Sequence, residues 1–260
     1  MLNLTDSFSV FLQKQFLFRP VTLPQTHRFV FDAPFDEHRI ETPDGAQLNA
    51  LFFPSRQPNS RGVVLYFHGN RGNLQRWGQL HQDFTSRGFD FFIPDYRGYG
   101  KSSGEPNEHT YFEDARLLYE RLHREYPADR IVLYGRSLGT GMASYLAAHV
   151  RARTVILETP FDNIPGLLAS YIGSRDIPLK PAFFFPNDRH IRQSPLPVLI
   201  FHGTRDRVVP YAAARNLQKC LKPDDRFVTI PNGSHNNLRE FELYQTELSL
   251  WLEGKHRDAD

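Results

Sequence analysis

The stretch IVLYGRSLGTGM, from Ile131 to Met142, decides how the chain is interpreted. Aliphatic residues and a tyrosine run directly into the pentapeptide GRSLG at 135–139, and small residues follow at helical spacing. This order predicts a strand, a sharp turn and a helix, with Ser137 at the apex of the turn. Glycines two residues to either side would avoid clashes between the strained turn and its neighbours. The pattern is typical of a nucleophile elbow; the alternative is an ordinary strand-to-helix turn that contains a serine.

Strands and helices alternate on both sides of this stretch. Short apolar runs predict buried strands, and apolar stripes at a spacing of three and four predict the helices between them. The strands expected are two within 38–53, then 62–67, 89–94, 130–134, 154–157, 198–201 and 227–230. Thr110 and Glu113 predict a capping box at the start of one helix. We therefore predict an α/β fold with a mostly parallel eight-stranded sheet, helices on both faces and a single domain over 1–260.

The composition excludes several classes of function. The 260 residues are 40% hydrophobic, and 31 Lys and Arg against 29 Asp and Glu give no argument for a nucleic-acid partner. The single cysteine, Cys220, excludes an internal disulfide and fits a reducing, cytoplasmic location. No cysteine cluster indicates a metal. The glycine-rich run at 95–102 lacks the spacing of a P-loop, so we interpret it as a loop that braces the site, and we expect no cofactor.

Residues 1–27 form an N-terminal extension before the first expected strand. The segment 1–20 lacks a basic region and a cleavage site, so no signal peptide is expected, and no apolar window is long enough to span a membrane. One helical face carries large apolar residues, which predicts packing on the protein's own surface. The alternative is a weak peripheral membrane contact. The residues of this face are Leu4, Phe8, Phe11, Leu12 and Phe16.

Residues 159–197 interrupt the alternation of strands and helices. The segment holds seven prolines and the run Phe183-Phe184-Phe185, with one helix expected near 163–172. Such an insertion between two parallel strands predicts a small cap above their carboxyl ends. We expect an apolar acyl pocket there, although the same aromatic residues would also suit the core. The residues expected to line this pocket are Trp77, Ile172, Phe183, Phe184 and Phe185.

A serine hydroxyl becomes nucleophilic only when a base removes its proton and an acid orients that base. Asp206 follows the expected strand 198–201 within HGTRDRVVP, and His235 follows the strand 227–230 within NGSH. Both would lie at the carboxyl ends of strands, in the order serine, acid, histidine. We predict that Ser137, Asp206 and His235 act together. Glu158 and Asp162 remain alternatives for the acid.

Acyl transfer also needs two backbone N–H groups for the oxyanion that forms. Leu138 follows the serine at a helix start and would supply one. The loop HGNRGN at 68–73 follows the first central parallel strand, and Asn70 would supply the other. His68, which precedes this turn, is interpreted as structural.

Five motifs, HGNRGN, DYRGYGKSSGEP, GRSLG, HGTRDRVVP and NGSHN, occur in the order and spacing of the α/β-hydrolase superfamily. The chain resembles, more narrowly, the membrane-associated α/β-hydrolase-domain serine hydrolases and their bacterial esterase-like relatives. The resemblance covers 38–253 and implies the same triad and the same oxyanion amides. Many membrane-associated relatives carry a transmembrane helix or acylated cysteines, which this sequence lacks. The segment 159–197 matches no known pattern, so the resemblance implies no substrate.

We therefore expect a cofactor-independent serine hydrolase of the carboxylesterase or thioesterase type. Its substrate would be a small molecule with an apolar acyl group, cleaved through an acyl-enzyme on Ser137. A peptidase or amidase could use the same triad. A non-catalytic binding protein is the third interpretation, and it would be expected to have a broken triad. The sequence leaves the oligomeric state open.

Overall fold

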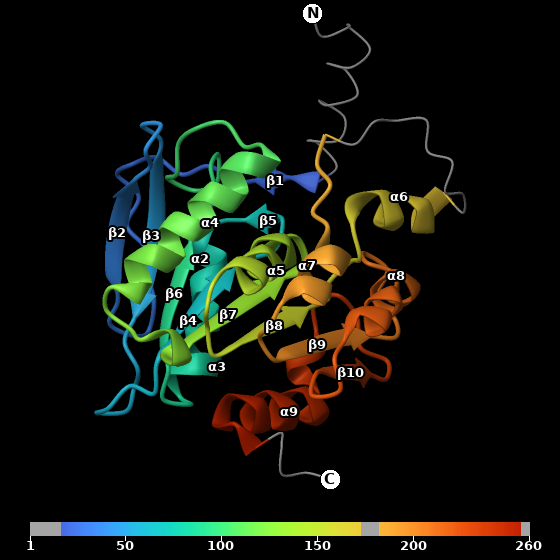
Figure 1. Ribbon diagram of the computed structural model, residues 1–260. Coiled ribbons are helices and arrows are strands. Elements are labelled where there is room, and N and C mark those ends of the chain that lie inside the picture. Colours follow the sequence, from blue (N-terminus) through green and yellow to red (C-terminus); the bar gives the residue numbers. More distant parts are fainter. Residues whose placement is uncertain (1–16, 173–181, 256–260) are drawn as a thin grey trace, which may run out of the picture.

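A computed structural model of the protein describes residues 17–172 and 182–255. Its centre is an eight-stranded sheet in the order β2-β3-β6-β4-β7-β8-β9-β10 (Figure 1). Strand β3 pairs antiparallel with β2 and β6, and every other neighbouring pair is parallel. The mostly parallel sheet is therefore confirmed. Its strands are Asp36–Glu41 (β2), Gln47–Phe53 (β3), Val63–Phe67 (β4), Asp90–Pro94 (β6), Ile131–Arg136 (β7), Thr154–Glu158 (β8), Val198–Gly203 (β9) and Arg226–Ile230 (β10).

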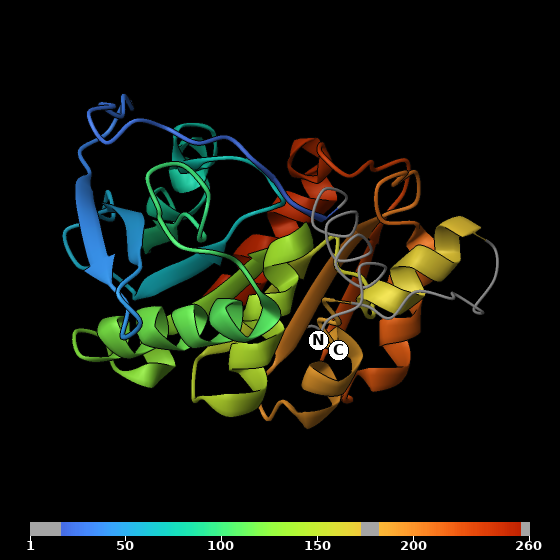
Figure 2. The same cartoon turned by 90° about the horizontal axis from the view of Figure 1, so that it is seen from above.

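Helices cover both faces of the sheet, as Figure 2 shows for α4 and α5 on one side and α9 on the other. Successive residues of a strand point to opposite faces, so Leu133 of β7 joins one apolar cluster and Tyr134 joins the other. Both clusters are buried, which explains the continuous apolar runs in the sequence. The helices are Leu74–Trp77 (α2), His81–Thr85 (α3), Glu108–His123 (α4), Thr140–His149 (α5), Ile164–Ile172 (α6), Asn187–Gln193 (α7), Tyr211–Arg215 (α8) and Glu242–Glu253 (α9).

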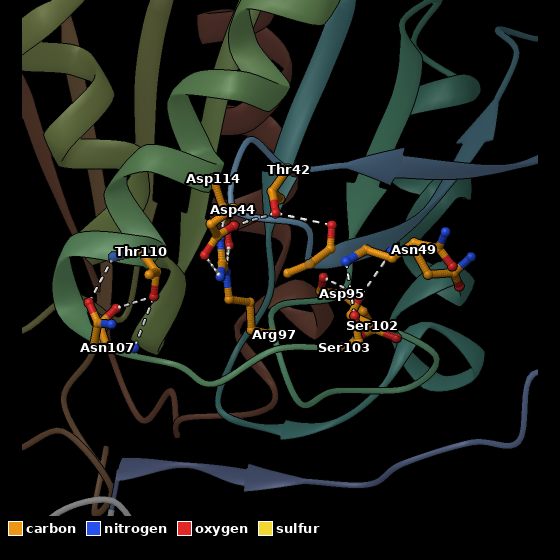
Figure 3. Close-up of polar contacts among 12 residues, drawn as sticks. Thr42, Asp44, Asn49, Asp95, Arg97, Ser102, Ser103, Asn107, Thr110 and Asp114 are labelled. Carbon is orange, nitrogen blue, oxygen red and sulfur yellow. Dashed lines mark hydrogen bonds and ion pairs between the residues drawn. The ribbon is translucent and has the colours of Figure 1, made fainter.

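The start of α4 differs from the prediction. The Asn107 side chain accepts a hydrogen bond from the Thr110 N–H at 2.9 Å, and the Thr110 hydroxyl accepts one from the Asn107 N–H at 3.0 Å (Figure 3). This capping box replaces the predicted pair of Thr110 with Glu113, which was wrong. Asparagine is as good an N-cap as threonine, and here it allows α4 to begin with Glu108.

The segment between β8 and β9 divides into two parts with different surroundings. Helix α6 packs against α8 and lies beyond the strand ends, whereas α7 packs against α5 within the helical layer (Figure 1). Phe183 and Phe185 are buried in the core. Phe185 fills the space beside Gly141, where a Cβ would lie 2.6 Å from its ring. Of the two described parts, the α6 part therefore covers the carboxyl ends of the strands and the α7 part does not.

The turn after β7 is strained at Ser137 and closely packed at the glycines on either side. Ser137 has a φ of 51°, a left-handed conformation that costs a non-glycine residue free energy. A Cβ on Gly135 would lie 2.5 Å from the carbonyl oxygen of Gly139, next to helix α5. A Cβ on Gly139 would lie 2.0 Å from the carbonyl oxygen of Phe67, the last residue of β4. The strand-turn-helix form predicted for GRSLG is confirmed.

A second, two-stranded ribbon joins the N-terminal part of the chain to the loop after β4. Its strands are Arg19–Pro20 (β1) and Arg71–Gly72 (β5), paired in parallel. Phe18 packs on Tyr111 and Phe183, at centroid distances of 5.4 and 4.7 Å. The apolar face predicted for the first turns of the chain lies within 1–16, outside the described residues. Within the part of the chain that the structure covers, no helix has the length and apolar character needed to cross a bilayer.

Replacing Gly139 by alanine should destabilise the protein severely. The new methyl group would meet a backbone carbonyl in a central strand, which has no free volume into which to move. We expect a loss of at least about 3 kcal/mol in the free energy of unfolding, measured by urea denaturation. Gly45→Ala is the matched control, because Gly45 has a φ of 83° and no atom within 4 Å of its Cβ position. It should cost only about 1 kcal/mol. Equal losses in the two variants would contradict the steric explanation.

Candidate active site

The structure brings the three predicted catalytic side chains together at the carboxyl ends of β7, β9 and β10. The His235 Nε2 atom lies 3.1 Å from the Ser137 Oγ atom. On the other side of the ring, Nδ1 lies 2.8 Å from Oδ2 of Asp206. All three residues come from the loops or turns that directly follow parallel strands, which explains why positions 98 and 29 residues apart in sequence meet. The contacts form one chain from carboxylate to imidazole to hydroxyl.

The loop after β9 fixes the carboxylate of Asp206. Its second oxygen accepts hydrogen bonds from the N–H groups of Val208 and Val209, both at 2.8 Å. His202 at the end of β9 donates through Nε2 to the carbonyl oxygen of Val209 at 2.9 Å. Burial lowers the pKa of His202, although nearby Asp206 opposes this effect. The same Nε2 atom lies 3.5 Å from Oδ2 of Asp206, so His202 and His235 both lie beside this carboxylate oxygen.

The two alternative acids have other partners. Glu158 accepts a hydrogen bond from the hydroxyl of Tyr134 at 2.7 Å and pairs with Arg136 at 3.3 Å. Asp162 accepts one from the Asn216 amide at 3.0 Å. Neither carboxylate contacts His235 among the interactions of the described residues. The geometry therefore favours Asp206 over both alternatives.

The loop after β4 lies directly beside the serine. The Cβ position of Gly69 is 3.8 Å from the Cβ atom of Ser137. The next residue, Asn70, has its carbonyl oxygen held by the Arg19 N–H at 2.9 Å and the Tyr99 hydroxyl at 2.8 Å. Its own N–H has no acceptor among the residues that the structure describes. Leu138 is the second residue of a short helical turn, where N–H groups lack partners within the helix.

The glycine-rich loop after β6 braces this region, as predicted. Asp95 contacts Nε2 of His68 at 3.1 Å and accepts a hydrogen bond from the Leu74 N–H at 3.1 Å. The Tyr96 hydroxyl donates to the carbonyl oxygen of His68 at 2.6 Å. His68 is fully buried among these partners, which supports its interpretation as structural.

The same loop is itself anchored further from the serine. Arg97 lies between two carboxylates, with hydrogen bonds to Asp44 at 2.6 and 2.9 Å and to Asp114 at 2.7 and 2.8 Å (Figure 3). The Ser102 hydroxyl accepts from the Asn49 N–H and donates to the carbonyl oxygen of Asp95, both at 2.8 Å. The loop is thus tied to the first hairpin and to α4.

Arg136 was missed by the sequence analysis. Its buried guanidinium donates to the carbonyl oxygen of His235 at 2.9 Å and pairs with Glu158. It also lies 5.1 Å from the centroid of the Trp77 ring. Burial alone would lower the pKa of Arg136, but Glu158 raises it well above its usual range. The sequence held one indication of this role. Arg136 lies inside the GRSLG motif, which must be buried, and a buried charge requires a partner.

A cavity of about 360 Å³ opens above Ser137. Helix α6 and the loop after β9 give it an apolar wall. Tyr171 of α6 donates a hydrogen bond to the carbonyl oxygen of Val208, which joins these two elements. The apolar lining residues are Leu17, Trp77, Leu138, Phe161, Ile164, Leu167, Val208 and Val209.

The predicted acyl pocket needs correction. Trp77 lines the cavity, but Phe183 and Phe184 do not. Phe183 packs in the core against Phe18, and Phe184 lies beneath the guanidinium of Arg189 at 5.4 Å. The side chain of Ile172 lies outside what the structure describes. The aromatic run therefore belongs to the body of the protein, and α6 supplies the apolar wall instead.

The rest of the cavity wall is strongly basic. Five arginines line it: Arg19, Arg71, Arg76, Arg136 and Arg207. No Asp or Glu is among the described residues of this wall. Burial lowers the pKa of Arg76, and the neighbouring charges of Arg136 and Arg71 lower it further. Over 17–172 and 182–255, no group of His, Cys, Asp and Glu is placed to hold a metal ion.

Comparison with known proteins gives the family. The family model described as serine aminopeptidase, S33, matches residues 58–172, from just before β4 to the end of α6. YfhR of Salmonella typhimurium is 30% identical over 210 residues, which cover 74% of this chain and 71% of that protein. Human alpha/beta hydrolase domain-containing protein 17B is 29% identical over 207 residues, which cover 78% of this chain and 70% of that protein.

Solved structures agree at the level of the fold. An esterase from Pyrococcus furiosus superposes with a TM-score of 0.69 at 17% identity, covering 91% of this chain and 98% of that one. An alpha-beta serine hydrolase homologue from Coxiella burnetii gives a TM-score of 0.62 at 18% identity, covering 90% and 100%. With the relatives above and the strand-turn-helix at Ser137, these matches have one explanation: the chain belongs to the α/β-hydrolase superfamily.

Proposed function

We propose that the protein is a serine hydrolase that cleaves carboxylic ester or thioester bonds through an acyl-enzyme on Ser137. The observation that carries this proposal is the continuous chain of contacts from Asp206 through His235 to Ser137 beside an open cavity. A binding protein on the same fold would have no need for a strained serine within 3.1 Å of an oriented imidazole.

The distances support a defined proton path. Nδ1 of His235 donates its hydrogen to Asp206, so Nε2 is the unprotonated acceptor that faces Ser137. As Oγ attacks the acyl carbon, its proton moves to Nε2, and the protonated imidazole then gives it to the leaving group. Water, activated by the same nitrogen, attacks the acyl-enzyme and releases the free acid.

The negative charge on the carbonyl oxygen needs donors that are in place before the reaction. The N–H groups of Asn70 and Leu138 are the candidates, because both residues line the cavity at the level of Ser137. The hydrogen bonds of the Asn70 carbonyl to Arg19 and Tyr99 restrain this peptide, which favours a hole that is ready before the substrate arrives.

The cavity lining favours an acyl ester over a peptide. An aminopeptidase must accept a free α-amino group, which is a cation at neutral pH, and five arginines would repel it. The apolar wall of α6 suits a hydrocarbon chain. The family model is nevertheless described as serine aminopeptidase, so a peptide substrate is the second candidate.

Ser137→Ala should abolish covalent labelling by a fluorophosphonate probe, because the probe bonds to the activated serine oxygen. Hydrolysis of an acyl ester should fall by about 10⁴-fold or more. Ser86→Ala, at an exposed serine on the far end of α3, is the matched control and should label like the wild type. A wild type that resists the probe would exclude the proposal.

Asp206→Asn should lower kcat by roughly 10³ to 10⁴-fold, because the imidazole loses the carboxylate that fixes its tautomer. The measurement is ester hydrolysis, with a thermal melt of each variant to verify folding. Asp162→Asn is the control at the alternative carboxylate and should retain most of the rate. If instead Asp206→Asn kept full activity, Glu158 or Asp162 would have to be the acid.

A substrate panel separates the two enzymatic candidates. Acyl esters and thioesters of four to twelve carbons are assayed beside aminoacyl p-nitroanilides with a free amine. We expect kcat/KM to rise with chain length until the apolar wall is filled, by about threefold to tenfold for each pair of methylenes. Higher activity on the amides would favour the peptidase.

A further inference from the structure

The five arginines around the cavity are a local concentration of charge that the whole chain does not share. Across the sequence, 31 basic residues are balanced by 29 acidic ones. In the described wall of the cavity, five arginines stand against no acidic residue. Four of the five side chains are exposed to solvent, and no described residue forms an ion pair with Arg19, Arg71 or Arg207. Within 17–172 and 182–255, the charges of these three arginines therefore have no acidic partner.

The β1–β5 ribbon holds two of these arginines side by side. Arg19 and Arg71 are register partners in the parallel pair, so their side chains leave the ribbon on the same face. Adjacent like charges on a sheet are destabilising. A ligand with negative charge would relieve this repulsion.

Trp77 holds two more arginines. The guanidinium of Arg76 lies 5.0 Å from the centroid of its ring, and that of Arg136 lies 5.1 Å from it. Such stacking lowers the rotational freedom of the two side chains, so less entropy is lost when they bind a ligand. The positive charge of Arg71 also repels that of Arg76, since it contributes to the lowered pKa of Arg76.

Most of the basic part and most of the apolar part of the cavity come from different elements, although Arg207 lies in the loop after β9 and Trp77 lies in α2. Arg19, Arg71 and Arg76 belong to β1, β5 and α2, whereas the apolar wall belongs to α6 and the loop after β9. Figures 1 and 2 both show β1 apart from α6, which lies toward α8. Ser137 lines the same cavity. A substrate in this cavity would meet a hydrocarbon surface at one end and a cluster of guanidinium groups at the other.

We infer that the substrate is an acyl ester or thioester whose leaving group carries phosphate, with its acyl chain along α6 and its phosphate on Arg19, Arg71 and Arg76. This inference rests on the proposed serine hydrolase function. Guanidinium groups match phosphate oxygens in paired hydrogen bonds. Phosphate also has more acceptors and charge than a carboxylate, which suits several arginines at once. Coenzyme A and the glycerol phosphate of a lysophospholipid share this chemistry.

Two matched substrate pairs test the inference. Octanoyl-coenzyme A is compared with the octanoyl thioester of N-acetylcysteamine, which keeps the thioester and lacks the phosphates. 1-Octanoylglycerol 3-phosphate is compared with 1-octanoylglycerol. In at least one pair, kcat/KM for the phosphate-bearing member should be higher by about tenfold at low salt, and this preference should shrink as ionic strength rises. The pair that shows it identifies the source of the phosphate.

Arginine variants show whether this preference comes from the cluster. The quantity measured is the ratio of kcat/KM within one pair, so a change that affects both substrates equally cancels. Arg71→Gln should lower the ratio by about fivefold, and Arg19→Gln combined with Arg71→Gln should lower it by about twentyfold. Arg124→Gln is the control, because this exposed arginine follows α4 and does not line the cavity. It should leave the ratio unchanged.

The possible failures are distinguishable. Ratios near one, or a ratio that survives the double variant, would overturn the inference and leave the hydrolase proposal intact. Fluorophosphonate labelling of Ser137 without hydrolysis of either phosphate-bearing substrate would overturn it as well. Absence of both labelling and hydrolysis would instead overturn the proposed function.

Discussion

The contact between Gly139 and the carbonyl oxygen of Phe67 is the constraint on which the rest of the site depends. A Cβ at this position would lie only 2.0 Å from that oxygen, so the turn after β7 is pressed against the end of β4. The loops that follow these two neighbouring strands are therefore side by side. One carries Ser137 and Leu138, and the other carries Asn70. A single steric condition thus brings the proposed nucleophile and both candidate oxyanion donors into one small region.

Arg136 extends this arrangement to the histidine. It contacts Glu158 at the end of β8 and the carbonyl oxygen of His235, so it joins the neighbouring strand to the histidine loop. Removing one partner of a buried ion pair leaves an uncompensated charge, which is costly. The network therefore restrains the histidine loop in a way that local turn residues alone would not. The Arg136 guanidinium also lies over the ring of Trp77, which lines the cavity, so the same network restrains this part of the cavity wall.

The sequence predicted the sheet well, because strands buried on both faces leave uninterrupted apolar runs. It also predicted that Ser137, Asp206 and His235 would lie close together, because the carboxyl ends of parallel strands share one edge. It did not predict which side of the segment 159–197 meets the cavity. Phe183 and Phe185 are equally apolar in a pocket and in a core, and only the space beside Gly141 decides between them. The α4 cap was misplaced because Asn107 and Thr110 are comparable N-caps. The arginine cluster draws on β1, β5, α2, β7 and the loop after β9, so no local pattern could reveal it.

The β1–β5 ribbon has a thermodynamic consequence. The Arg19 N–H is bonded to the carbonyl oxygen of Asn70, so docking of the N-terminal strand and ordering of the Asn70 peptide are two parts of one equilibrium. Linkage is reciprocal: whatever stabilises the docked strand favours the ordered peptide, and a ligand that orders the peptide tightens the strand by the same factor. The strand β1, more than a hundred residues before Ser137 in the sequence, is thereby coupled to the ordering of the Asn70 peptide, a candidate oxyanion donor.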